Sequence, residues 1–485
     1  MAAKLRPIRT KLIKDPSDHD SDGDGIDEPV TPAGSLFFNS GFNLHILVIL
    51  GFKSPININN FKAGLRDTIL KHKRFCSIIK ENDKGELYWV PTPVNLDDHI
   101  VIVESDNADV GSLTFVEDYT AKLAQSLPLD PSRPLFEFHI VKAKLGDAAE
   151  NLIFRVHHAV GDGTSLMSLL LACTRKANQP DSLPTLPTLA HKSPRKHTVF
   201  EALGVYLWSF LVILWLTFLD ICSLLATMLW LEDSQTPLKG YAGIERLQRR
   251  LAHKTVSMDD IQLVKEATHG TVNDVVFGMI AAGMSRYLQQ SGSTKTQMAH
   301  LRVRACALVN TRKSPGLQEL KSMMAGGSQA RWGNNMGYII LPVPLLPGES
   351  PLNYVYKAKT IIDKKKLSLG AAFSYISGKI LIRLIGSEVP KRLTYNCTLH
   401  TTFAFSNVFG PLEEIELFGH PVTHIIPTVA GQPQALCVHV QSYMGKVTLV
   451  VSSAKDIIPD PDRLCQYMVC ALEDMKKMLP PRKEE

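Results

Sequence analysis

The chain has 485 residues, a length at which globular proteins usually divide into more than one domain. Apolar residues make up 45% of it and charged residues 21%, which is a globular rather than a disordered composition. The net charge of +6 is small for this length, so nucleic acid is not expected as a partner. The eight cysteines form no CxxC pair and no zinc-type cluster with histidine, so we expect no metal site and a cytosol-facing protein.

Residues 1–28 form a basic stretch followed by an acidic run, and they are predicted to be a disordered tail. Asp18, Asp20, Asp22 and Gly23 match the first half of a calcium-binding loop. The last ligand position would be Pro29, which supplies no carboxylate, so the sequence leaves calcium binding by the tail open.

Residues 29–185 are predicted to form a mixed α/β lobe. Apolar or alternating runs at 46–50, 135–143 and 152–156 indicate strands. The last of these leads directly into two histidines. After them, Thr164 or Ser165 is expected to cap a helix whose apolar side chains share one face.

Residues 186–240 are predicted to be a linker that contains the most apolar run of the chain, 203–231. This run carries one charged side chain, Asp220, and tryptophans at 208, 215 and 230. Its length exceeds what is needed to cross a bilayer core of about 30 Å, and its aromatic residues are typical of a lipid interface. We therefore predict a membrane-associated segment; the alternative is a very apolar core helix.

Residues 241–485 are predicted to form the second lobe. Ser257 with Asp260, and Thr271 with Asp274, are expected to begin two helices as capping boxes. Apolar runs at 305–309, 338–343, 402–406, 438–443 and 446–453 indicate strands, and 461–479 a final helix.

The segment that carries chemistry is His157-His158-Ala159-Val160-Gly161-Asp162-Gly163. Adjacent side chains at a strand end point in opposite directions, so only one histidine can face a given cavity. A neutral imidazole accepts and returns a proton near pH 7. Asp162 lies near a helix start, where a carboxylate accepts backbone N–H bonds or pairs with arginine. The alternative is two packed histidines beside a tight turn.

The segment has the HHxxxDG form of the chloramphenicol acetyltransferase-like superfamily, and the chain most resembles plant wax ester synthase/diacylglycerol acyltransferases. Further stretches support the resemblance in family order: 28–37, 133–136, 273–276, 333–337 and 406–411. Phe136 and Phe409 depart from the family's tryptophan and proline, which puts substrate fit rather than catalysis in question. The resemblance implies a two-lobed α/β sandwich of the condensation-domain type, with an added membrane-associated segment.

Residue by residue, the resemblance implies that His158 is the general base, with His157, Asp162 and the turn residue Gly163 in supporting roles. Asn273, Ser406 and Asn407 are expected to contact substrate; helix capping by Asn273, and a strand-to-turn signal at 406–407, are the alternatives. No cofactor is implied, because acyl-coenzyme A is a co-substrate. The expected partners are acyl-coenzyme A, a fatty alcohol or diacylglycerol, and membrane lipids.

The implied activity is formation of wax esters from long-chain acyl-coenzyme A and fatty alcohol, with triacylglycerol synthesis as a second activity. Transfer to another alcohol or amine, and a non-catalytic lipid-binding protein of the same fold, remain alternatives. The expected location is the endoplasmic reticulum membrane with both lobes in the cytosol, or the plasma membrane. A single crossing at 203–231 would separate the lobes, so the segment is expected to lie in the interface, or to dip in and return near Asp220.

Overall fold

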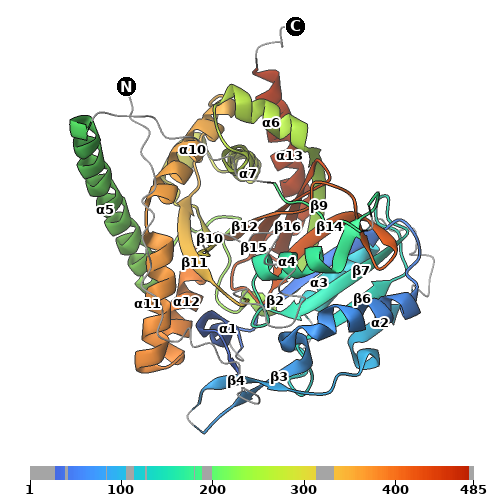
Figure 1. The fold of residues 1–485 in the computed structure, drawn as a ribbon. Helices are drawn as coiled ribbons and strands as arrows, with labels where there is room; N and C mark the ends of the chain where they lie inside the picture. Colours follow the sequence, from blue (N-terminus) through green and yellow to red (C-terminus); the bar gives the residue numbers. More distant parts are fainter. Residues whose placement is uncertain are drawn as a thin grey trace.

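The computed structural model describes residues 28–38, 42–83, 85–104, 114–125, 128–179, 181–187, 199–312 and 332–479. Apart from Glu28, the predicted disordered tail lies outside these residues. Within them the chain is built around two large sheets that face each other, with most helices on their outer sides and α3 Phe115–Gln125 packed between them (Figure 1).

The first sheet has seven strands. In spatial order they are β5 Ile100–Val103, β6 Phe136–Val141, β7 Glu150–His157, β2 His45–Phe52, β14 His420–Ala430, β13 Ile415–Leu417 and β8 Thr174–Lys176. The helices of this half of the chain are α1 Pro32–Phe37, α2 Ile58–Asp67, α3 Phe115–Gln125 and α4 Gly163–Cys173. A small third sheet joins β1 Glu28–Pro29, β4 Leu87–Pro91 and β3 Ser77–Glu81.

The second sheet has six strands. In spatial order they are β11 Met336–Pro342, β10 Arg304–Asn310, β12 Phe403–Phe409, β15 Leu436–Tyr443, β16 Lys446–Ala454 and β9 Arg249–Ser257. Its helices are α6 Met258–Ala267, α7 Val272–Gln290, α8 Lys295–His300, α10 Pro351–Leu367, α11 Gly370–Ile385, α12 Glu388–Leu399 and α13 Pro461–Lys477.

Three apolar cores hold these layers together. One lies between the second sheet and α7, α10 and α13, and a second lies between the first sheet and α2 and α4. A third, smaller core lies between the two sheets and includes Leu47, Ile153, Ile426 and Val450. Because this third core draws on both sheets, the lobes form one packed body around the site.

The second half of the chain contributes strands to the first sheet. β13 and β14 come from the second half of the chain, yet β14 pairs with β2 at the centre of the first sheet. The predicted division into consecutive lobes at 29–185 and 241–485 does not account for this contribution. The alternation of side chains along β14 shows a buried strand, but nothing in it names β2 as the partner.

The apolar segment forms a single helix, α5 Val199–Leu229, with no break near Asp220. The expectation that it turns back at Asp220 is therefore wrong. Asp220 pairs with Lys365 of α10, and the backbone N–H of Leu369 donates to Thr217 Oγ1, so this part of α5 is fixed to the body. Figure 1 shows the other end of α5 standing clear of the sheets.

Candidate active site

The two histidines lie at the end of β7, which finishes at His157. His157 faces His45 of β2, with 5.2 Å between ring centroids. His158 has the opposite parity, which it shares with Phe154, a residue of the apolar side of the sheet. Its backbone N–H donates to Leu44 O at 2.8 Å, and both histidines are buried.

The imidazole of His158 is bonded to Asn334, a residue of the second half of the chain. His158 Nδ1 lies 3.0 Å from Asn334 Oδ1, and Asn334 Nδ2 donates to the backbone oxygen of His158 at 2.8 Å. The second bond orients the amide, so its oxygen faces the ring. Because that oxygen only accepts, Nδ1 must carry the hydrogen, and Nε2 of the neutral ring is left as a proton acceptor.

Burial lowers the pKa of His158 below its usual value of 6.5. A hydrogen bond to its own backbone, the charge of Asp162 and the bond to Asn334 act in the opposite direction. The ring therefore stays neutral at pH 7 and can accept a proton.

His157 is in a different environment. Its Nδ1 accepts the N–H of Ala159 at 3.0 Å, and its Nε2 is buried without a hydrogen-bond partner among the described residues. Burial, together with charge on His158, lowers the pKa of His157 to about 3. A histidine held in this way supports the turn and is not available for proton transfer.

Asp162 ties the turn to the second half of the chain. It caps α4 by accepting the N–H of Ser165 at 2.9 Å, and its other oxygen accepts from Arg312 Nη1 at 2.7 Å and from the N–H of Asn335 at 3.1 Å. The sequence indicated Thr164 or Ser165 as the cap of α4, and this prediction is wrong, because the capping residue is Asp162. Asp162 is 1% exposed, so the buried carboxylate is stabilised by these hydrogen bonds instead of by water.

The two glycines of the turn differ. A Cβ on Gly161 would lie 3.1 Å from the ring of Trp332, whose Nε1 donates to Val160 O at 2.5 Å. A Cβ on Gly163 would meet only Val408 Cγ2, at 3.8 Å. The tighter approach is therefore at Gly161, where a side chain would require Trp332 or Ser165 to shift, whereas Gly163 begins α4 and leaves space beside it.

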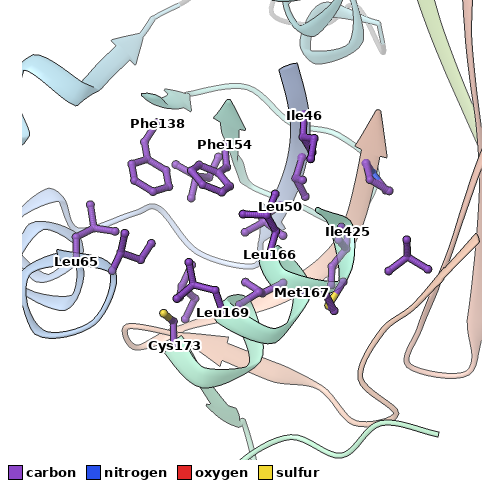
Figure 2. Close-up of a pocket in the computed structure, with 18 of the residues that line it drawn as sticks. Ile46, Leu50, Leu65, Phe138, Phe154, Leu166, Met167, Leu169, Cys173 and Ile425 are labelled. Atoms are coloured by element: carbon purple, nitrogen blue, oxygen red, sulfur yellow. The ribbon is translucent and has the colours of Figure 1, made fainter. Parts of the chain in front are cut away.

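An apolar cavity lies on the same side of β7 as His158. It encloses about 800 Å³, part of it open to solvent. Strands β2, β6 and β7 line one wall and helices α2 and α4 the other, as Figure 2 shows. Almost every lining side chain is apolar: Ile46, Val48, Leu50, Phe61, Leu65, Ile69, Phe138, Leu152, Phe154, Leu166, Met167, Leu169, Leu170, Cys173, Val408, Leu417, Phe418, Ile425 and Pro427.

The three predicted substrate contacts lie on α7 and β12. Asn407 Nδ2 donates to Asn273 Oδ1 at 2.6 Å, so the structure brings these two together. Asn273 does not cap α7; Thr271 does, with Asp274 completing the predicted capping box. Ser406 is half-buried beside Asn407 on β12. The next residue, Val408, lines the cavity and faces Gly163.

Sequence reasoning assigned no role to Asn334, Arg312 or Trp332. Asn334 lies in the stretch Gly333-Asn334-Asn335-Met336-Gly337, which supported the family resemblance but was given no contact with His158. Their partners in the histidine turn and at the start of α4 lie at least 147 residues away along the chain. The paired asparagines between two glycines of this stretch were the available signal.

Comparison with known proteins agrees with this geometry. Residues 43–276 match the profile "Wax ester synthase/diacylglycerol acyltransferase catalytic domain", and residues 332–476 match "WS/DGAT C-terminal domain". The chain is 38% identical to wax ester synthase/diacylglycerol acyltransferase 5 of Arabidopsis thaliana, over 94% of both chains. It is 39% identical to number 11 of the same plant, over 93% of this chain and 95% of that one.

Among solved structures, the wax ester synthase/diacylglycerol acyltransferase of Marinobacter aquaeolei VT8 superposes with a TM-score of 0.57 at 18% identity, covering 93% of this chain and 99% of that one. A condensation domain of the CDA synthetase gives 0.54 at 15% identity, covering 89% and 91%. The predicted two-lobed, condensation-domain-like α/β fold is confirmed. The chain belongs to the wax ester synthase/diacylglycerol acyltransferase family.

Proposed function

We propose that this acyltransferase moves the acyl group of a long-chain acyl-coenzyme A onto the hydroxyl of a fatty alcohol, and onto diacylglycerol as a second acceptor. The observation that carries the proposal is the buried His158, whose Nδ1–H is held by Asn334 and whose Nε2 is free of that bond, together with an apolar cavity on the same side of β7 that Gly163 of the turn helps to line. The names of the plant relatives point to the same two acceptors.

The proposed reaction needs one base. His158 Nε2 takes the proton of the acceptor hydroxyl while that oxygen attacks the thioester carbonyl. The carbon–sulfur bond then breaks, and the imidazolium returns the proton to the departing thiolate. The products are an ester and free coenzyme A, and His158 ends neutral. No cofactor and no covalent enzyme intermediate are required.

The apolar cavity is proposed to hold a hydrocarbon chain of one substrate. Its lining offers an alkyl chain contacts similar to those of a protein interior, and its one amide side chain is Gln441. A related condensation domain was solved in complex with C8-CoA, an acyl thioester of coenzyme A. Asn273, Ser406 and Asn407 are proposed to contact the reacting groups, because Val408 beside them connects the cavity to the turn at Gly163.

We infer that α5 contacts a bilayer without crossing it. Thr185 before it is bonded to Glu413, and Asp233 after it is bonded to Arg304 and Thr402, so both flanks are held by one body. If α5 crossed, residues 188–198 would have to return through hydrocarbon as a polar chain with three basic side chains. The proposed location is the cytosolic face of the endoplasmic reticulum, with the plasma membrane as the alternative.

The chemistry is tested with labelled acyl-coenzyme A and the full chain, offering fatty alcohol and diacylglycerol separately. His158→Ala should lose about 10²–10⁴-fold in rate with either acceptor. His300→Ala, on the exposed helix α8, is the matched control and should keep full activity. Full activity of His158→Ala would overturn the mechanism. No activity of the wild type with either acceptor would instead favour another acceptor or a non-catalytic role.

The topology is tested by protease protection in sealed microsomes. Tags at the two ends of the chain should both be digested from the cytosolic side. A protected tag at one end and an accessible tag at the other would show that α5 crosses, and the proposed topology would be wrong.

A further inference from the structure

Helix α11 has an apolar outer face that no part of the described chain covers. Ile376, Ile380 and Leu384 recur every four residues, so they lie in one stripe along the helix. They are 37%, 50% and 76% exposed. Ile385 and Val389 continue this surface with exposures of 53% and 49%. A contiguous apolar stripe of this kind marks an interaction surface rather than a scatter of single exposed residues.

A second exposed apolar face, that of α5, adjoins the start of α11. A Cβ on Gly370, the first residue of α11, would lie only 2.9 Å from Asp220 Cβ, and Asp220 is paired with Lys365 of α10. Asp220, the one acidic residue between Tyr206 and Leu229 of α5, is thus turned inward against the body. Figure 1 shows α5 and α11 along the same edge of the molecule. The outward side of α5 is apolar and aromatic: Tyr206, Leu207, Trp208, Phe210, Leu211, Leu214, Trp215, Phe218, Leu219 and Leu225.

The basic side chains around this surface indicate a negatively charged partner. Between Lys364 and Ser387 the sequence has five basic side chains and no acidic one, and of these Lys365 is paired with Asp220 and Lys366 with Asp363. Two of the other three, Lys379 and Arg383, lie on α11 itself. Apolar side chains flanked by basic ones, with tryptophans along the adjoining helix, match a bilayer surface that contains anionic lipid.

The inner face of α11 reaches the site. Tyr375 Oη donates to Asn335 Oδ1 at 2.7 Å, and the N–H of Tyr338 donates to Ser374 Oγ at 2.8 Å. Asn335 adjoins Asn334, which holds His158. Farther along α11, Ile382 packs on the cluster of Phe37, whose ring centroid is 4.8 Å from that of His158. The helix therefore has one face toward solvent and the other against the segments that hold His158.

We propose that the outer faces of α5 and α11 together dock the protein on a bilayer containing anionic lipid, with α11 between that lipid and His158. The docking brings the acceptor, dissolved in the same leaflet, to the side of the molecule where the ester is made. This last step rests on the proposed acyl transfer, whereas the docking itself does not.

The docking is tested by sedimentation of the full chain with vesicles of phosphatidylcholine, alone or mixed with phosphatidylserine. The double variant Ile380→Glu/Leu384→Glu should bind vesicles about ten-fold more weakly or worse, because two apolar side chains no longer enter the interface. Lys379→Ser/Arg383→Ser should lose only the added affinity for phosphatidylserine, about five-fold per charge. Leu412→Glu/Met478→Glu is the matched control, since these side chains are 54% and 56% exposed elsewhere.

Two results would overturn the docking proposal. One is wild-type vesicle binding by Ile380→Glu/Leu384→Glu. The other is a dimer in lipid-free solution that this variant abolishes while vesicle binding is kept, which would assign the stripe to a second copy of the chain. Correct folding is read from transfer to a short-chain, water-soluble alcohol, which should stay at the wild-type rate while KM for a vesicle-embedded fatty alcohol rises. An inactive wild type would contradict the proposed function but leave the sedimentation result intact.

Discussion

The two sides of the end of β7 carry the same side chain in opposite settings. On one side, His158 is bonded to an amide of the second half of the chain, which fixes its hydrogen on Nδ1. On the other, His157 packs against His45 and Phe38, and its Nε2 has no partner among the described residues. The difference supports the proposal that His158 rather than His157 is the proton-transfer group, because the amide leaves Nε2 of His158 as the proton acceptor.

The contrast extends to the charged groups nearby. Asp162 and Arg312 lie on the His158 side and join the turn to the loop at 332–335. His45 on the other side has its pKa lowered to about 2 by burial, reinforced by the neighbouring His157, Arg155 and His158. The His158 side is thus a hydrogen-bonded polar network, whereas the other side holds the two buried, neutral rings of His45 and His157.

The largest expected effect is on the His158 side itself. His158→Ala should reduce kcat/KM by about 10²–10⁴-fold, because the group that accepts the hydroxyl proton is lost. Thermal unfolding of the variant should remain cooperative. The loss of kcat/KM in His158→Ala is compared with the loss in His157→Gln. Equal losses in the two variants would mean that the two histidines share the chemistry.

The next effect is on stability. Asp162→Ala should destabilise the fold by about 3–5 kcal/mol, because Arg312 and two backbone N–H groups lose their buried acceptor. Urea unfolding followed by circular dichroism measures this. Lys359→Ala, which breaks an exposed pair with Asp363, is the control and should cost about 0–1 kcal/mol. A similar small cost for Asp162→Ala would show that the turn does not depend on this carboxylate.

A smaller loss is expected at Asn334. Asn334→Ala leaves the backbone oxygen of His158 without its donor and the ring without its acceptor. If the loss of these hydrogen bonds raises the activation free energy by about 1–3 kcal/mol, kcat should fall by about 5–150-fold. The loss should appear in kcat rather than KM if the amide orients the base.

The pH profile of kcat/KM tests whether Asn334 acts on the imidazole of His158 or only packs against it. Burial lowers the pKa of His158, so the acidic limb of kcat/KM in the wild type should lie below pH 6.5. Asn334→Asp adds a negative charge beside Nδ1 and should move that limb to higher pH. An unmoved limb would contradict the proposed contact between Asn334 and the base.

The smallest effect on activity is expected from His157→Gln, less than about ten-fold, because this ring accepts no substrate proton. The variant should instead change the pH dependence of stability. In the wild type the folded-state pKa of about 3 lies below the unfolded value of 6.5, so the unfolded state binds the extra proton and stability is lost as pH falls through this window. Urea midpoints between pH 7 and 4 should fall less steeply in His157→Gln.

Several features of the site followed from local sequence. The two histidines at a strand end, the capping box of Thr271 and Asp274, and most strands of the second sheet were predictable, since each depends on periodicity or on residues three or four positions apart. In the first sheet only β2, β6 and β7 were predicted, and β5, β8, β13 and β14 were not. The exposed apolar helix was also predictable from composition. Its continuity through Asp220 was not, because the charge is compensated by Lys365, which lies 145 residues farther along the chain.

The sequence by itself determined which side chains are proposed to carry the chemistry, because the HHxxxDG segment is contiguous and its strand, turn and helix form from neighbouring residues. Only the tertiary structure decided which partners hold those side chains. Asn334 meets His158 across 176 residues, β14 enters the first sheet, and α11 presents one face to solvent and the other to the site. Such pairings depend on which distant segments pack together, and local periodicity carries no information about the partner.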